Sequence, residues 1–417
     1  MSEQEGDALA RSTADAVARR SYGKLVAFLA ARTRDVAGAE DALAEAFATA
    51  LADWPVSGCP SNPEAWLLTV ARRKMIDGSR RRRTGDIVTS QLQVLADGLD
   101  AAAGEDVIPD QRLALLFACA HPAVEAGIRA PLMLQVVLGL DAAMIASAFL
   151  MAPAAMGQRL VRAKNKIRQA GIPFQVPGHD ELAGRLDTVL DAIYAAYSEG
   201  WADAVGADVA RRELAGEALY LGRLVTELLP GEPEALGLLA LMLHAEARRK
   251  ARRNAEGDYV PLASQDTTLW DLPTIAEAES LLLKASTADS VGRFQLEGAL
   301  QSAHVHRRMT GTQNWPDVLA LYDALFALAA SPVVAINRSL AIAELQGADA
   351  AVAALNEVAS DGRLAQYQPY WAARAELLAR TGNHTEARQA YEIAIGLERE
   401  PAVRRYLQQR QAILRSH

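Results

Sequence analysis

The sequence predicts an almost wholly α-helical fold, and three features of its 417 residues support this. Alanine and leucine, which both favour helices, dominate the chain. Runs of β-branched residues are scarce, and no stretch alternates apolar and polar side chains as a half-buried strand does. Apolar residues instead recur three and four positions apart, which places them on one helix face. We therefore expect an all-α protein with several hydrophobic cores.

The overall composition is that of a folded protein of the cell interior. Charged residues make up 23% of the chain and hydrophobic residues 51%, which argues against extensive disorder. The two cysteines, Cys59 and Cys119, lie far apart without CxxC spacing, so neither a zinc site nor a disulfide framework is indicated. The N-terminus lacks the apolar core of a signal peptide, and no apolar run reaches the length of a membrane span. We expect a cytoplasmic protein without a membrane partner.

Residues 13–54 show the spacing of two helices, with a bend near residues 34–38. The second of these helices has an apolar face and an acidic face. The apolar face contains Leu43, Phe47, Ala50 and Trp54, and the acidic face contains Glu40, Asp41 and Glu45. Such an acidic stripe is either a solvated surface or a binding surface for a basic partner.

A strongly basic helix is predicted next, after a loop over residues 55–63. Asn62 is suited to cap this helix and Pro63 to begin it. Its apolar side contains Trp66, Leu67, Val70, Ala71 and Met75, and its basic run contains Arg72, Arg73, Lys74, Arg80, Arg81, Arg82 and Arg83. So dense a basic run indicates a polyanionic ligand. The alternative is a solvated helix end, because Gly78 could stop the helix early.

The next segment changes character before the helical pattern returns. Residues 84–110 are acidic and interrupted by glycine, which predicts a flexible linker. From Gln111 onward, two apolar helices lead to a pair of short helices over residues 138–168. Asp141 stands where the N-cap of the first short helix belongs, and Pro153 falls in the first turn of the second.

This short pair has the pattern of a helix-turn-helix. The first helix buries Ala142, Ile145, Ala146 and Phe149, and the second buries Met156, Leu160, Ala163 and Ile167. The opposite face of the second helix carries Gln158, Arg159, Arg162 and Lys166. Residues in these positions read bases and grip phosphates in a helix-turn-helix protein. Two helices that merely pack together would show the same apolar pattern.

The order of these parts resembles the two core domains of extracytoplasmic-function (ECF) sigma factors of bacterial RNA polymerase. The resemblance covers about residues 10–172 and rests on DALAEAF, AWLLTVARRKMID and QRLVRAKNKIR, in that order. It implies a region 2 domain over 10–83, which binds core polymerase and the promoter −10 element. It also implies a region 4 domain over 111–173, which reads the −35 element. Neither task requires a catalytic residue or a cofactor.

The resemblance also assigns roles to individual residues. Core polymerase binding falls to Asp41 and Glu45, with Phe47 in the core beside them. Binding of the −10 strand falls to Trp66, Arg72, Arg73, Lys74, Asp77 and Arg80. Reading of the −35 element falls to Gln158, Arg159, Arg162 and Lys166. The chain departs from the family at Met144, where many members have Glu, and at Arg73–Lys74, where an Arg-Asn pair is common, so the promoter sequence does not carry over.

The remainder of the chain is helical and acidic. Residues 1–177 contain 20 Lys and Arg against 19 Asp and Glu, whereas the rest contain 23 against 32. We expect a helical extension over 178–310, followed by tetratricopeptide-like (TPR-like) repeats over 311–417. The repeat is indicated by Trp371, Gly382, Ala387, Tyr391 and Ala394, with Gly347 and Ala359 at matching offsets 35 residues earlier. A helical bundle without repeats is the alternative.

Such an extension resembles that of one subgroup of ECF sigma factors, in which it controls activity in place of a separate anti-sigma factor. The subgroup carries an Asp-Gly-Pro-Phe signature. The nearest match here is the segment Ser290 to Phe294, which keeps Gly and Phe but not Pro. The TPR-like surface would then bind a protein partner.

These observations predict a sigma factor and not an enzyme. The sequence contains no Walker loop, GxSxG or HExxH motif. His304 and His306 stand two residues apart and so cannot face together on a helix, which argues against a metal site. Two alternatives are a helix-turn-helix activator with a TPR sensor, and a TPR scaffold whose basic helices only pack. The basic segment 66–83 distinguishes the sigma factor from both alternatives, because neither of them needs a second helix that binds a DNA strand.

Overall fold

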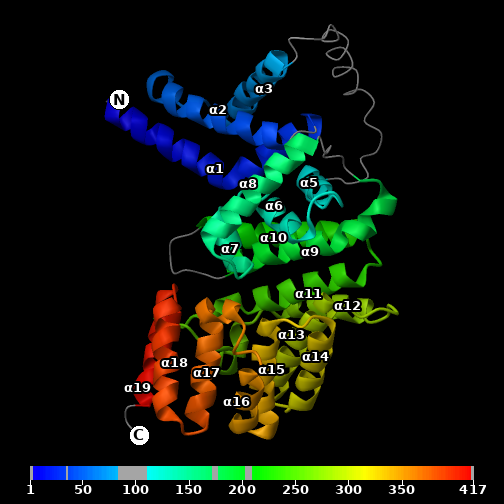
Figure 1. The fold of residues 1–417 in the computed structure, drawn as a ribbon, viewed down its shortest axis with the longest axis vertical. Helices are drawn as coiled ribbons and strands as arrows, with labels where there is room; N and C mark the ends of the chain where they lie inside the picture. Colours follow the sequence, from blue (N-terminus) through cyan, green and yellow to red (C-terminus); the bar gives the residue numbers. More distant parts are fainter. Residues whose placement is uncertain (1–2, 34–35, 83–109, 171–176, 202–208, 415–417) are drawn as a thin grey trace. The chain divides into compact units, whose positions relative to one another are not determined.

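The computed structural model describes residues 3–33, 36–82, 110–170, 177–201 and 209–414 (Figure 1). Within these ranges the chain is built from helices and has no strand longer than the single bridge between Arg253 and Tyr259. The all-α prediction is therefore confirmed. The chain forms two compact units, Met1–Ala196 and Tyr197–His417. No single helix in the described ranges is both long and apolar enough to cross a membrane.

Three helices open the first unit: α1 (Glu3–Thr33), α2 (Val36–Ser57) and α3 (Pro63–Arg82). They pack around fully buried Leu29, Leu43, Trp54 and Leu67. The predicted cap is present, since the Asn62 side chain accepts a hydrogen bond from the backbone of Ala65 at 3.0 Å. The loop expected from Pro55 begins later, at Gly58. A proline in the last turn removes a single hydrogen bond, so α2 continues past it.

The second half of this unit contains α5 (Gln111–Cys119), α6 (Ala126–Val136), α7 (Ala142–Ala148) and α8 (Pro153–Ala170). The predicted linker lies almost wholly outside the described residues, which resume at Asp110. The Asp110 carboxylate accepts hydrogen bonds from the backbone of Arg112 and Leu113 and so begins α5. Helix α9 (His179–Trp201) follows.

The second unit contains a largely buried helix, α11 (Pro233–Ala247), near its start. Helix α10 (Val209–Leu228) leads to α11, and residues 229–232 separate the two helices. Three short 3₁₀ turns follow at Arg249–Arg252, Leu262–Ser264 and Thr267–Leu269. Helices α12 (Leu272–Ala285) and α13 (Arg293–Thr310) then pack on α11.

Glycines allow α11 and α13 to approach closely. A Cβ atom on Gly237 would lie 2.5 Å from the backbone nitrogen of Gln295. One on Gly298 would lie 3.1 Å from the carbonyl oxygen of Gly237. At this crossing Glu234 of α11 caps the N-terminus of α13. Its carboxylate accepts hydrogen bonds from the backbone of Phe294 at 2.9 Å and of Gln295 at 3.0 Å. The signature-like segment therefore begins α13, and a side chain on α11 holds that helix end.

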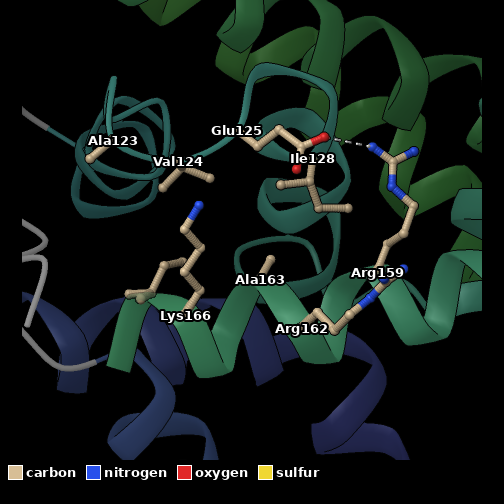
Figure 2. Close-up of a pocket in the computed structure, with 9 residues that line it drawn as sticks. Ala123, Val124, Glu125, Ile128, Arg159, Arg162, Ala163 and Lys166 are labelled. Carbon is tan, nitrogen blue, oxygen red and sulfur yellow. Dashed lines mark ion pairs between the residues drawn. The ribbon is translucent and has the colours of Figure 1, made fainter. Parts of the chain in front are cut away.

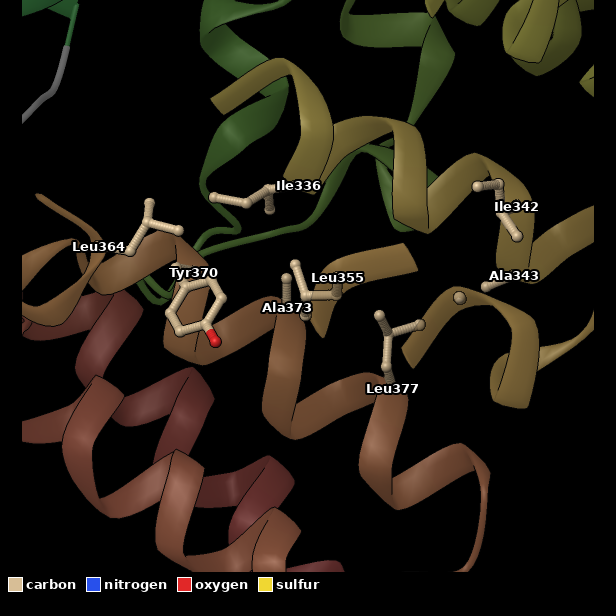
Figure 3. Close-up of a cluster of buried hydrophobic side chains, with 9 residues drawn as sticks. Ile336, Ile342, Ala343, Leu355, Leu364, Tyr370, Ala373 and Leu377 are labelled. Atoms are coloured by element: carbon tan, nitrogen blue, oxygen red, sulfur yellow. The ribbon is translucent and has the colours of Figure 1, made fainter. Parts of the chain in front are cut away.

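The rest of the second unit is a series of short helices. They are α14 (Trp315–Leu328), α15 (Pro332–Gln346), α16 (Ala348–Asn356), a 3₁₀ turn at Gly362–Gln366, α17 (Gln368–Arg380), α18 (His384–Leu397) and α19 (Pro401–Ile413). Figure 3 shows one of their shared cores, in which Ile336, Leu355 and Leu377 converge from three helices. Gly347 and Gly382, 35 residues apart, both follow a helix end with positive φ, 91° and 79°.

Candidate nucleic-acid interface

Helices α7 and α8 form the predicted helix-turn-helix. The Asp141 carboxylate caps α7 by accepting hydrogen bonds from Ala143 and Met144, each at 2.8 Å. The chain reverses at Leu150, whose φ of 51° lies in the left-handed region. The two helices are bent by 108° relative to each other, within the range of this motif. Ile145, Met156 and Leu160 are buried between them, which fixes the direction of the basic face of α8.

The basic face of α8 borders a hollow of about 260 Å³, which the α5–α6 connection closes on its other side. Arg159, Arg162 and Lys166 line it together with Glu125 and Ile128 (Figure 2). Gln158, Arg162 and Lys166 are exposed. The structure therefore brings the predicted −35 residues onto one accessible face.

Arg159 differs from its neighbours because it is already engaged. One of its Nη atoms donates to the carbonyl oxygen of Gly127 at 3.1 Å, and the other donates to the sulfur of Met151 at 3.3 Å. The Glu125 carboxylate lies 3.7 Å away and forms an ion pair with it. Arg159 thus ties α8 to α6 and to the turn before α8. Arg162, by contrast, donates to a carbonyl oxygen of its own helix, that of Gln158 at 3.4 Å.

The basic surface of α3 is exposed at Arg72, Arg73 and Lys74. Trp66 is half-buried, and its ring meets that of Trp54 edge-on with centroids 5.4 Å apart. The Arg72 guanidinium lies over the Phe28 ring at 4.9 Å, which holds it against α1. Trp66 therefore also supports the core of the first three helices. The side chains of Asp77 and Arg80 fall outside the described residues.

The acidic face of α2 is divided between two environments. Asp41 and Glu45 are exposed, and the Glu45 carboxylate forms an ion pair with Lys74 of α3 at 3.4 Å. Phe47, expected in the core, is half-buried and stacks on Tyr22, so it lies at the edge of the core. Glu40 is only 8% exposed and meets Lys164 of α8 at 3.1 Å. Burial, with Glu40 and then Asp41 adding negative charge, raises the pKa of Tyr22 to about 12.

The pairing of Glu40 with Lys164 was not predicted from the sequence. Lys164 lies two positions beyond Arg162, so on a helix it points away from the basic face. This offset is the feature of the sequence that could have indicated a partner for Lys164 other than DNA. The ion pair of Glu125 with Arg159 could not be predicted from the sequence, because it depends on the fold of the α5–α6 connection. Within the described ranges, no three His, Cys, Asp or Glu side chains come together as a metal site.

A helical unit that combines an exposed basic helix with a helix-turn-helix is typical of a DNA-binding protein. Comparison with known proteins agrees with this class. Residues 17–84, which contain α2 and α3, match the sigma-70 region 2 family. This match points to a sigma factor of the sigma-70 family, in which region 2 binds core RNA polymerase and promoter DNA.

Two further comparisons concern the rest of the chain. Residues 185–286 match a family of unknown function, DUF6596. A protein of Rhizobium meliloti (strain 1021), described as uncharacterised, is 39% identical over 368 residues, which cover 86% of each chain. The similarity thus extends through both units. No solved structure matches the chain.

Proposed function

We propose that this protein is an ECF-type sigma factor that directs core RNA polymerase to one class of promoters, and that its second unit regulates this activity. The match of residues 17–84 to sigma-70 region 2 carries the proposal. The helix-turn-helix of α7 and α8 supports it, because a second DNA reader follows region 2 in the same unit. The proposal includes a cytoplasmic location and no catalytic activity.

The exposed groups on α8 are suited to the −35 element. Gln158 and Arg162 offer an amide and a guanidinium, which are the groups that pair with base edges in the major groove. Lys166 supplies a cation for the phosphate backbone. Because Arg159 is held by Gly127, Met151 and Glu125, its main task is to position α8, with a phosphate contact as the secondary task.

The surface of α3 is suited to an unpaired DNA strand. Arg72, Arg73 and Lys74 are exposed on one turn, and Trp66, about two turns earlier on the same helix, is half-buried and so keeps part of its ring accessible. Cations that follow the backbone and aromatic rings that stack on bases are the usual means of holding single strands. Asp77 and Arg80 continue the same helix in this proposal. Asp41 and Glu45, exposed on α2, present the acidic surface to core polymerase.

The second unit is the proposed regulator, with TPR-like pairs that bind a protein partner. Two observations support the repeat: the 35-residue spacing of Gly347 and Gly382, and the burial of Ala387, Tyr391 and Ala394 where α18 packs on α17. Small residues at such positions let paired helices approach closely.

Reconstituted transcription tests the proposal. Purified protein is added to core polymerase that lacks any sigma factor, and genomic templates are screened for transcripts with defined starts. We expect promoter-specific transcripts that require the added chain. If none form, either with the full chain or with residues 1–196 alone, the sigma proposal is wrong. Transcripts that require a second sigma factor would favour a helix-turn-helix activator instead.

A further inference from the structure

A long apolar groove runs between α12 and α13 in the second unit. Its volume is about 830 Å³, and residues of both helices and of the start of α14 line it. Both helices pack mainly on α11 and meet each other less, which leaves the groove between them. Leu283, Val291 and Met309 line it, and these residues are 72%, 65% and 48% exposed. Exposed apolar side chains that gather in one groove are typical of a binding surface.

The dimensions of the groove fit a helix. Its lining residues extend from Gln295 to Thr310 on α13, which is about 22 Å along the helix axis, or about four turns. An amphipathic helix of about 15 residues covers that length with side chains three and four positions apart. An extended segment fits less well, because its backbone groups need partners from a strand edge. The single β-bridge in the described ranges, Arg253–Tyr259, does not border the groove.

The charged side chains that line the groove are acidic. They are Glu279 on α12 and Asp317 on α14, and none of the described lysines or arginines lines it. The Glu279 carboxylate accepts a hydrogen bond from the Ser302 hydroxyl at 2.7 Å and lies 3.4 Å from Nε2 of His244. That imidazole is neutral at pH 7, since burial and then Arg248 lower its pKa to about 4. Within the described part of the chain, Glu279 therefore has no cation to balance its charge.

This carboxylate determines which occupant the groove favours. A purely apolar ligand would desolvate Glu279 without compensation. A fatty acid or another anionic lipid would bring a second negative charge close to it. A lysine or arginine on the apolar face of a helix avoids both costs, because its long stem covers apolar surface while its charged group pairs with the carboxylate.

We propose that this groove binds an amphipathic α-helix of a partner protein. The apolar face of that helix lies against Leu283, Val291 and Met309 and carries a lysine or arginine that pairs with Glu279. The groove gives the second unit a partner surface outside the TPR-like pair of α17 and α18. A regulatory role for this partner rests on the proposed function, whereas the binding itself does not.

Selection from a library of helical peptides tests the proposal. The library displays helices of about 15 residues with random side chains on one face, and it is selected on the full-length chain. We expect the enriched peptides to have apolar residues three and four positions apart, with a lysine or arginine on the same face. A selection that enriches no peptide, or that enriches peptides without this cation, would overturn the proposal.

Matched substitutions locate the binding site. Leu283→Ser removes an exposed apolar side chain from the groove, and Leu328→Ser removes one from α14 outside the groove. Glu279→Gln removes the charge but can still accept the hydrogen bond of Ser302, and Glu256→Gln removes an exposed charge outside the groove. Fluorescence anisotropy of an enriched peptide should give a Kd about tenfold higher for the two groove variants and unchanged for the two controls. Equal Kd values for the parent chain and Leu283→Ser would contradict the assignment.

Two other occupants give different results with the same variants. If the chain alone dimerises in analytical ultracentrifugation and Leu283→Ser is monomeric, the groove binds a second copy and the proposal is wrong. It is also wrong if oleate displaces the peptide and binds the parent chain as tightly as it binds Glu279→Gln. None of these measurements needs polymerase or promoter. The groove proposal can therefore fail while the chain still initiates transcription, and it can hold while transcription fails.

Discussion

At the scale of single residues, two histidines of the second unit, His244 and the half-buried His304, make its stability depend on pH. His244 is fully buried, and burial followed by the nearby Arg248 lowers its pKa to about 4. Burial, with Arg307 and Arg248 adding positive charge, lowers the pKa of His304 to about 4 as well. Although His244 lies 3.4 Å from Glu279, its imidazole is therefore neutral at pH 7, and the contact is not an ion pair.

The sign of the pH effect follows from these pKa values. Unfolded histidine titrates near 6.5, so between pH 6.5 and 4 the unfolded state binds more protons. Stability is therefore complete above pH 6.5 and is lost as the pH falls toward 4. From pH 7 to pH 5 we expect each histidine to cost at most about 2 kcal/mol of unfolding free energy. Urea denaturation at pH 7 and at pH 5 measures this loss of unfolding free energy.

Substitutions assign the effect to particular side chains. His244→Leu should reduce the loss of stability between pH 7 and 5, whereas His306→Leu, at an exposed position of α13, should leave it unchanged. An equal effect of both substitutions would contradict the assignment to buried histidines.

Arg162 is the residue for which we expect the clearest DNA phenotype. Arg162→Ala should weaken binding of the polymerase complex to its promoter by about 1–3 kcal/mol, because a guanidinium that reads a base edge is lost. Binding to core polymerase alone should not change, since Arg162 is exposed on α8, far along the chain from the proposed polymerase-binding residues of α2, and its hydrogen bond is to Gln158 of the same helix. Promoter filter binding and a core-polymerase pull-down measure the two. Arg363→Ala, on the surface of the second unit, is the control. If Arg162→Ala loses both promoter binding and core-polymerase binding, Arg162 is needed for folding and not for reading DNA.

The sequence indicated the surface residues better than it indicated their partners. Helix periodicity placed Gln158, Arg162 and Lys166 on one face, because a fixed spacing determines the direction of each side chain. It could not show that Arg159 is tied to Gly127 and Met151, nor that Glu40 is buried, because both depend on contacts between distant segments. The roles assigned to the site residues by resemblance stay predictions.

At the scale of helices, boundaries were predictable wherever a local capping residue sets them. Asn62, Asp141 and Pro153 mark helix starts in the sequence and in the structure. The path of α2 through Pro55 was not predicted, because a proline near a helix end is tolerated when packing favours the continued turn. Helix crossings were also not predicted, since they depend on which glycines face another backbone.

The crossing of α11 and α13 provides a sharp test of such a glycine. Gly237→Ala should lower the unfolding free energy by about 1–3 kcal/mol, because the new methyl group meets the Gln295 backbone and the helices must separate. Gly216→Ala, on the exposed side of α10 with no atom within 4 Å, should instead stabilise by about 0.5–1 kcal/mol. Urea denaturation compares the two, and equal effects would refute the close approach.

At the scale of the whole molecule, the division into two compact units predicts more than one unfolding step. Calorimetry of the full chain should show two transitions. Gly237→Ala should lower the midpoint of one of them and leave the other in place, because each unit has its own core. A single transition whose calorimetric and van't Hoff enthalpies agree would show that the units unfold together.

The sequence predicted the general organisation of the chain but not its internal contacts. The all-helical class, the basic helix and the helix-turn-helix followed from local patterns, and the region 2 family match covers the basic helix. The proposed domain limits within each unit and the TPR assignment stay predictions. Local patterns report the spacing of side chains along one segment, whereas the approach of α1 to α6 depends on residues more than a hundred positions apart.

The cap on α13 has a consequence for how this sequence can diverge. A Cβ atom at Gly292 would lie 2.2 Å from the Glu234 carboxyl group, so a side chain at 292 would force that carboxylate to move and to give up its hydrogen bonds to the start of α13. The proline of the Asp-Gly-Pro-Phe signature, which this segment lacks, is not part of this constraint. Among relatives that keep this helix start, Glu at 234 and glycine at 292 should therefore be inherited as a pair and lost as a pair.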